Sequence, residues 1–349
     1  MSVAEAAVNS PRVYQHPSPN AAWLAQRVED AIDPALPIVD PHHHLWERHG
    51  DRYFLDELLA DTGSGHNIVA TVFVQCAWAY RTDGPEALRP VGETEFVAAV
   101  ADAADRRRIK TRVCAGIVGH ADLRLGEGVE PVLDAHIAAA GGRFRGVRYV
   151  TARSEDFVAS ILAPPPAGMM SDPAFRDGFG RLGKFGLSFD AWLYHTQIAE
   201  LTGLARAFPE ILIVIDHVGG PLGIGPYQGR RDAVFATWRR DMKLLAACPN
   251  VSVKLGGLAM LVAGFALHEK PLPPSSEELA RVWRPYMEAC IEDFGAARCM
   301  FESNFPVDKA MCGYTVLWNA FKRIAAGASA TEKALLFHDV AAKVYRLSA

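Results

Sequence analysis

The sequence lacks the features that mark secreted, membrane-spanning and cysteine-rich zinc proteins. Its six cysteines are scattered without a C-x-x-C pair, which argues against a disulfide framework or a cysteine zinc site. The first residues are not a charged start followed by an apolar run, so we expect no signal peptide. No apolar stretch approaches the length of a membrane span. We therefore expect a cytoplasmic protein in a reducing compartment.

An excess of charge of one sign is also absent. The 349 residues include 36 Lys and Arg against 40 Asp and Glu, which gives a formal net charge of −4. This slight acidity provides no basic footprint for nucleic acid or an anionic membrane, so we expect neither as a partner. We expect a small-molecule ligand, and the sequence leaves homo-oligomerisation open.

Apolar runs that suit buried strands are present, and they alternate with helical stretches. Eight such runs follow one another along the chain, which predicts a (β/α)₈ barrel. A doubly wound sheet is the alternative, but no G-x-G-x-x-G turn follows the first strand. We expect an N-terminal arm over residues 1–36, with a short helix over residues 21–31, and the barrel over residues 37–349. Within the barrel we expect an ordered surface loop over residues 154–170 and a closing helix over residues 331–346. The predicted strands cover residues 38–41, 68–75, 111–118, 144–149, 186–192, 211–217, 251–255 and 299–302.

Residues 38–46 hold the densest group of reactive side chains. Ile38 and Val39 suit a buried strand, and the chain should leave that strand beyond Pro41. His42 and His44 lie two positions apart, so in an extended backbone they point to the same side. Two converging imidazoles can hold a metal or polarise a carbonyl; the alternative is a histidine-rich surface turn. We expect Asp40 to orient a neighbouring histidine or to cap the turn.

Polar residues also follow the other predicted strands. In a barrel the reactive residues lie at the carboxyl ends of the strands. Each of these residues alone has a structural explanation, such as a salt bridge or a loop cap, but as a set they indicate a site. They are Gln75, Arg148, Asp190, Tyr194, His195, His217, Lys254, Glu302, Ser303 and Asn304.

Five segments together resemble the amidohydrolase-related metal-dependent hydrolases. The resemblance lies in the branch that contains 2-pyrone-4,6-dicarboxylate lactonase and sugar lactonases. The resemblance implies a barrel with its site at the strand ends, and hydrolysis of a lactone or a similar acyl compound. The segments occur in the family's order and are residues 40–46, 144–148, 215–221, 253–258 and 300–307.

The resemblance also implies roles for individual residues. His42 and His44 match the H-x-H pair, which in relatives binds a divalent metal or polarises the lactone carbonyl. His217 matches a histidine that acts on the same carbonyl. Arg148 matches an arginine that holds a substrate carboxylate, a role that its bidentate guanidinium suits.

Asn304 departs from the family pattern, because the family usually has an aspartate there as the general base. An amide cannot take a proton at neutral pH, so Asn304 can position water but cannot be the base. The base is then Glu302, Asp308 or a neutral histidine of the cluster. We favour the histidine or Asp308, because Glu302 lies deeper in the barrel. The missing carboxylate also weakens the case for a metal.

The sequence therefore predicts a hydrolase that opens a small carboxylated lactone. The alternatives are metal-assisted decarboxylation of an aromatic or unsaturated acid, and a barrel that binds an acid without turning it over. We expect no required cofactor, or a weakly bound zinc or manganese ion at His42, His44 and His217. The predicted catalytic residues are His42, His44, His217, Asn304, Asp308 and Glu302, and the predicted substrate-binding residues are Arg148, Lys254, Gln75, Trp46, Trp192 and Tyr194.

Overall fold

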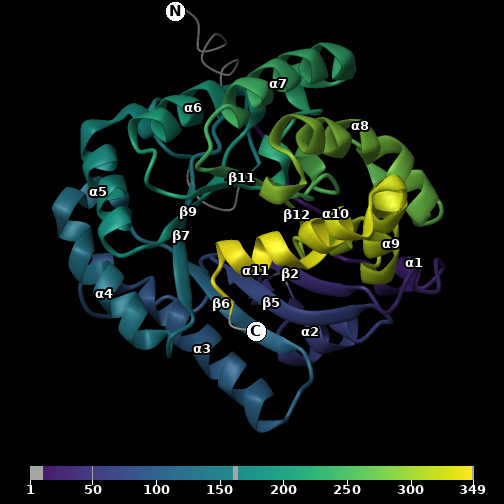
Figure 1. Cartoon of the computed structure of the whole chain (residues 1–349), viewed down its shortest axis with the longest axis horizontal. Coiled ribbons are helices and arrows are strands. Elements are labelled where there is room, and N and C mark those ends of the chain that lie inside the picture. The colour runs from purple at the N-terminus through teal and green to yellow at the C-terminus, as the bar shows by residue number, and fades with distance from the viewer. Residues whose placement is uncertain (1–10, 49, 160–163, 348–349) are drawn as a thin grey trace, which may run out of the picture.

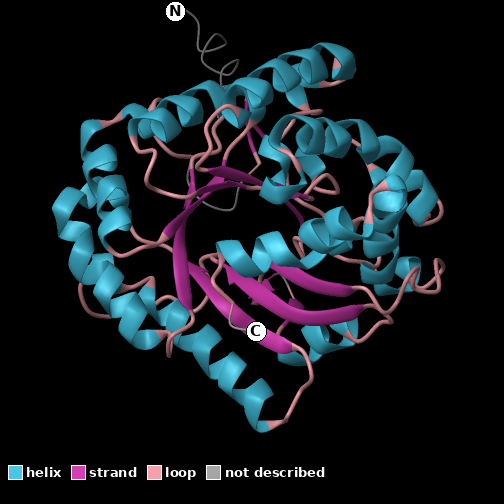
Figure 2. Cartoon of the chain, in the orientation of Figure 1, coloured by secondary structure: helices cyan, strands magenta, loops and turns pink. Residues whose placement is uncertain are grey.

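The computed structural model describes residues 11–48, 50–159 and 164–347. Eight parallel strands form one sheet, surrounded by helices (Figures 1 and 2). The sheet closes after its last strand, because Asn304 N donates to His42 O at 2.9 Å and His44 N donates to Phe305 O at 2.7 Å. The predicted (β/α)₈ barrel is confirmed. Its strands are β2 (Pro37–His43), β5 (Asn67–Val74), β6 (Arg112–Gly119), β7 (Phe144–Val150), β9 (Ser188–Trp192), β10 (Ile213–Ile215), β11 (Val251–Leu255) and β12 (Cys299–Phe301).

Helices cover the outside of the barrel and bury one apolar face each against the strands. Their starts follow the usual capping chemistry: Asp172 accepts a hydrogen bond from Phe175 N, and Ser275 accepts one from Glu278 N. No helix in the described residues is both long and apolar enough to cross a bilayer. The covering helices are α2 (Leu55–Thr62), α3 (Val91–Arg106), α4 (Glu130–Ala139), α5 (Pro173–Lys184), α6 (Ile198–Ala207), α7 (Arg231–Ala246), α8 (Ser276–Phe294) and α9 (Tyr314–Ile324).

The C-terminal segment closes the amino end of the barrel. It is divided into α10 (Ala330–Ala334), a π-helical turn (Leu335–Asp339) and α11 (Val340–Val344), where one helix was predicted over residues 331–346. α11 crosses the barrel in Figure 1, and Tyr345 reaches the barrel interior, where its hydroxyl donates to Asp190 Oδ2 at 2.6 Å. The opposite, carboxyl end therefore remains for a ligand.

Three local predictions are wrong. The first strand continues past Pro41 to His43, because a register shift between Asp40 and His43 accommodates the missing proline N–H. The helix predicted over residues 21–31 is only α1 (Ala21–Leu24), which buries no side chain and so gains little from packing. The loop predicted over residues 154–170 contains β8 (Phe157–Val158), which pairs with β1 (Arg12–Val13) of the arm. A hairpin of β3 (Trp46–Arg48) and β4 (Asp51–Tyr53) was not predicted.

Candidate active site

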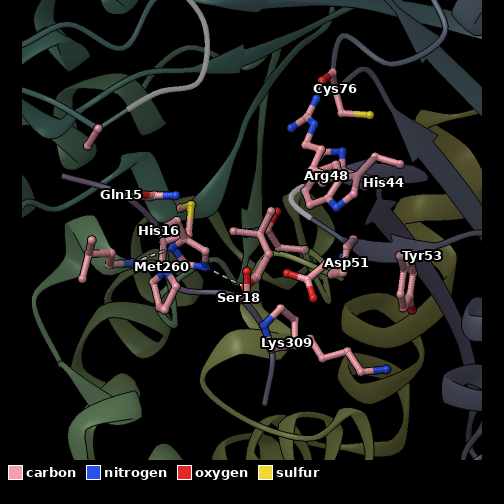
Figure 3. Close-up of a pocket in the computed structure, with 18 of the residues that line it drawn as sticks. Gln15, His16, Ser18, His44, Arg48, Asp51, Tyr53, Cys76, Met260 and Lys309 are labelled. Atoms are coloured by element: carbon pink, nitrogen blue, oxygen red, sulfur yellow. Dashed lines mark hydrogen bonds between the residues drawn. The ribbon is translucent and has the colours of Figure 1, made fainter. Parts of the chain in front are cut away.

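A pocket of about 390 Å³ opens at the carboxyl end of the barrel. Its size suits one small organic molecule. Figure 3 shows His44 and Arg48 on one side of it, and Gln15, His16 and Met260 on the other. Seven of the predicted site residues line the pocket: His44, Trp46, Arg148, Trp192, Tyr194, His217 and Asn304.

Glu302 holds His217 at the base of the pocket. The Nδ1 atom of His217 lies 2.7 Å from Glu302 Oε1, and the backbone N–H of His217 donates to the same oxygen at 3.0 Å. Burial opposes the charge on Glu302, but His217 and His42 outweigh it and lower the pKa of Glu302 to about 2. An ionised carboxylate only accepts hydrogen bonds, so Nδ1 of His217 carries the hydrogen, and in the neutral ring Nε2 keeps a lone pair. This is the arrangement of a histidine base with an orienting carboxylate.

Two glycines make room for this pair. A Cβ atom on Gly256 would lie 2.4 Å from Glu302 Cγ, and one on Gly257 would lie 2.5 Å from the His217 ring. His217 itself has a φ of 56°, in the left-handed region that non-glycine residues seldom adopt. Such strain persists only where surrounding contacts fix it, and it often occurs at functional positions. The Glu302 contacts fix it here.

His44 and His42 are held in different ways. His44 Nδ1 lies 2.7 Å from the carbonyl oxygen of Val74, which can only accept, so Nε2 of neutral His44 is an acceptor and cannot donate to an oxyanion. Burial, reinforced by Arg148, keeps the pKa of His44 well below 6.5. His42 Nδ1 lies 2.9 Å from Glu302 Oε2 and 3.1 Å from Lys254 Nζ. Its Nε2 is buried without a hydrogen-bond partner in the described structure.

Lys254 lies inside the barrel, behind His42, and does not line the pocket. Its ammonium group is 2.7 Å from Asp190 Oδ2 and 3.0 Å from Asp216 Oδ1. Burial alone would lower the pKa of Lys254, but the two carboxylates outweigh it and raise that pKa. Lys254 therefore neutralises buried carboxylates, and its position does not suit the substrate contact that the sequence predicted.

Asn304 presents its amide oxygen to the pocket. Its Nδ2 donates to Asp308 Oδ1 at 2.8 Å, so Oδ1 is the atom free to accept from a ligand or a water. Asp308 also accepts from Ala259 N at 3.3 Å and does not line the pocket. Burial raises the pKa of Asp308 well above 3.8. The geometry makes Asp308 an anchor for Asn304 and a poor candidate for the base.

Two guanidinium groups line the pocket side by side along the end of β5. Arg148 donates through Nη2 to Gln75 O and through Nε to Gln75 Oε1, and Arg48 donates to Cys76 O. Gln75 thus supports Arg148 rather than lining the pocket. In the described part of the chain neither arginine has an ion pair with a carboxylate. Arg148 is buried and Arg48 is half-buried, and buried charges are usually paired, so the pocket is suited to an anionic group.

The donor set near the pocket fits a divalent metal ion. His42, Asp216 and His217 each provide one ligand atom, and these atoms lie within 4.8 Å of one another. The unpartnered Nε2 of His42 and the orienting Glu302 carboxylate are features that accompany histidine ligands. The predicted metal ligands were His42, His44 and His217, so Asp216 takes the place of His44 in the observed group. Lys254 competes for Asp216, which weakens the attraction for a cation.

Sequence reasoning missed several site residues. Arg48 gave no signal because it belongs to a short hairpin without a periodic pattern. Asp216 was not among the predicted site residues, although its position beside His217 after an apolar strand was a usable signal. Residues of the N-terminal arm also line the pocket, from Gln15 to Pro19. Their contact with the site is non-local and leaves no local signal.

Comparisons with known proteins agree with this fold and identify the family. The family described as Amidohydrolase matches residues 39–347. Protein y4mH of Sinorhizobium fredii is 35% identical over 334 residues, covering 89% of this chain and 99% of that protein. L-fucono-1,5-lactonase of Burkholderia ambifaria is 29% identical over 279 residues, covering 78% of this chain and 81% of that enzyme. A crystal structure of an amidohydrolase from Burkholderia multivorans with bound zinc has a TM-score of 0.69 at 23% identity, covering 89% and 99% of the two chains.

Proposed function

The chain belongs to the amidohydrolase family, and we propose that it is a hydrolase that opens a small carboxylated lactone by adding water to the ring carbonyl. The single observation that carries this proposal is the His217–Glu302 pair at the base of a small pocket. The relative that acts on L-fucono-1,5-lactone supports a lactone as the substrate class.

His217 acts as the general base. Its Nε2 lone pair takes a proton from water while the water oxygen bonds to the carbonyl carbon. The proton then passes from Nε2 to the ring oxygen as the carbon–oxygen bond of the lactone breaks. Glu302 holds the Nδ1 hydrogen throughout, so the imidazole keeps the tautomer that the reaction needs. The Oδ1 atom of Asn304 accepts a hydrogen bond from the same water and orients it.

Arg148 and Arg48 hold the acid group of the substrate. Their remaining N–H groups suit the two oxygens of a carboxylate, and neither arginine forms an ion pair with a protein carboxylate among the described residues. The Arg48 guanidinium also lies 4.5 Å from the centre of the Trp46 ring, which fixes its plane at the pocket wall.

A divalent ion at His42, Asp216 and His217 would polarise the lactone carbonyl as a Lewis acid. The Nε2 lone pair of His217 cannot serve an ion and a proton at the same time. We assign it to the proton, because Lys254 already neutralises part of the negative charge that would attract a cation.

A pH-indicator assay tests the proposed function. Purified protein is offered 2-pyrone-4,6-dicarboxylate and, as a neutral comparison, L-fucono-1,5-lactone. We expect acid release to be faster with the carboxylated lactone. Arg148→Ala should lower kcat/KM for it by roughly 10- to 1,000-fold, the value of a lost charge-assisted contact. Arg124→Ala, an exposed arginine paired with Asp122, is the control and should change nothing. Equal rates on both lactones, unaffected by Arg148→Ala, would contradict the acid-binding role.

A further inference from the structure

The N-terminal arm lies outside the segment that matches the family, yet it forms part of the pocket. The family match begins at residue 39, whereas the pocket is lined by Gln15, His16, Pro17, Ser18 and Pro19. Figure 3 shows Gln15, His16 and Ser18 beside Met260, across the pocket from Arg48 and His44. The arm therefore supplies a wall that the barrel itself does not contain.

The pocket-lining part of the arm is fixed at both ends. Before it, β1 pairs with β8, Tyr14 N donates to Val158 O at 2.8 Å, and the Tyr14 ring packs edge-on against Phe157. After it, Trp23 Nε1 donates to Lys270 O at 3.0 Å and Arg27 Nε donates to Pro273 O at 3.1 Å. A segment held in this way is pre-organised, so a ligand pays little entropy to order it.

His16 joins the arm to the two loops that border the reacting groups. Its Nε2 lies 2.9 Å from the carbonyl oxygen of Val307, and its Nδ1 accepts from Leu261 N at 3.4 Å. Val307 follows Asn304 by three residues, and Leu261 follows β11. An acceptor at one ring nitrogen and a donor at the other select the neutral imidazole. Burial, which lowers the pKa of His16, acts in the same direction.

We infer that the arm is the specificity-determining wall of this pocket, and that His16 is the positioning residue that sets its distance from the site. The wall limits the substrate to one small ring. Its amide and hydroxyl groups, from Gln15 and Ser18, face the end of the substrate opposite the acid group held by Arg48 and Arg148. The substrate class is then a compact lactone that carries a carboxylate at one end and a polar substituent at the other. That the substrate is a lactone rests on the proposed function.

Steady-state kinetics with two variants test the role of the wall. His16→Ala removes both hydrogen bonds and should raise KM for 2-pyrone-4,6-dicarboxylate by roughly 2- to 12-fold for each bond lost, with kcat within about twofold. It should also reduce the preference for this lactone over a bulkier one that carries an alkyl ester in place of one carboxylate. Gln26→Ala is the matched control, because its exposed side chain donates within the arm, to Ala22 O, and lies outside the pocket lining. Its KM and preference should stay at the wild-type values. Unchanged KM and preference in His16→Ala, or equal shifts in both variants, would overturn the inference.

Hydrogen exchange of the unliganded full chain separates this inference from the proposed function. The Tyr14 amide is hydrogen-bonded to Val158 O, so we expect it to exchange far more slowly than an unstructured amide. If the wild-type protein opens no lactone but the Tyr14 amide is protected, the proposed function fails while the arm still forms the wall. The wall is then tested by comparing the affinities of wild type and His16→Ala for 2-pyrone-4,6-dicarboxylate. An unprotected Tyr14 amide would show that the arm does not form the wall, whatever the activity.

Discussion

Replacing Glu302 with glutamine tests the proposed base most sharply. The substitution keeps the size of a fully buried side chain but removes the charge that His217 Nδ1 and His42 Nδ1 contact at 2.7 and 2.9 Å. The amide can still accept one hydrogen bond, but its NH₂ group now faces one of the two imidazoles. The tautomer with a basic Nε2 on His217 is then no longer enforced.

The expected magnitude follows from the role of the pair. General acid–base catalysis contributes about 10²- to 10⁴-fold, or roughly 3 to 5 kcal/mol of transition-state stabilisation. We therefore expect Glu302→Gln to lower kcat by about that factor while KM changes little, because Glu302 does not line the pocket. Stopped-flow or pH-indicator kinetics on 2-pyrone-4,6-dicarboxylate measure both constants.

Asp308→Asn is the matched control for this experiment. Asp308 is equally buried and also carries a carboxylate near Asn304, but it does not line the pocket. Its variant should retain kcat within about tenfold, the effect of losing one hydrogen bond. If Asp308→Asn abolishes activity while Glu302→Gln retains it, the His217–Glu302 assignment is refuted and Asp308 is the base.

Three further predictions concern Asn304, the metal and acid stability. Asn304→Asp should lose activity, because the new carboxylate would lie where Nδ2 now donates to Asp308 at 2.8 Å, and each acid would raise the pKa of the other. A gain of activity over a broad pH range would instead indicate that the chain had merely lost its base. Activity should survive dialysis against a chelator, and excess zinc should inhibit by occupying His217 Nε2; loss on chelation that zinc or manganese restores would show that a metal is required. Burial lowers the pKa of His43 to about 4, whereas the pKa of a histidine in the unfolded chain is about 6.5. The stability of the fold associated with the neutral His43 ring is therefore complete above a pH of about 6.5. It decreases by about 3 kcal/mol as the pH falls from about 6.5 to about 4. Urea unfolding of wild type and His43→Gln across that range should show a flatter pH dependence in the variant, and equal slopes would assign the acid sensitivity to other groups.

The sequence was sufficient for the barrel because its strands are apolar runs of ordinary length separated by amphipathic helices. It also placed His44, Arg148, His217 and Asn304 near one another, since parallel strands bring their carboxyl ends to one face. The predicted histidine base remains a prediction, now with Glu302 as the residue that orients it.

The sequence could not predict how deep each side chain lies in the barrel or which tautomer each histidine adopts. Lys254 and Asn304 both follow strands, but Lys254 points into the barrel, where Asp190 and Asp216 hold it, while Asn304 faces the pocket. The alternation along a strand predicts which face of the sheet a side chain points to, but not its position along the barrel axis. The resemblance implied that His44 binds a metal or polarises the lactone carbonyl, but the Val74 carbonyl fixes the neutral tautomer whose Nε2 cannot donate a hydrogen bond to that carbonyl. Contacts between the arm and the pocket span hundreds of residues, so no local pattern encodes them.

Hydrolysis in ¹⁸O-labelled water, followed by mass spectrometry of the product, tests the central claim most directly. The substrate in this experiment is a saturated lactone, because its ring-opened alcohol does not exchange oxygen with water. If water adds to the lactone carbonyl with His217 as the base, a single turnover with excess enzyme should give the ring-opened acid with one ¹⁸O atom in the new carboxyl group and none in the new hydroxyl. His217→Asn should form this product at a rate lower by at least the factor expected for Glu302→Gln. A product that has instead lost carbon dioxide, or the label in the hydroxyl oxygen, would contradict hydrolysis at the carbonyl.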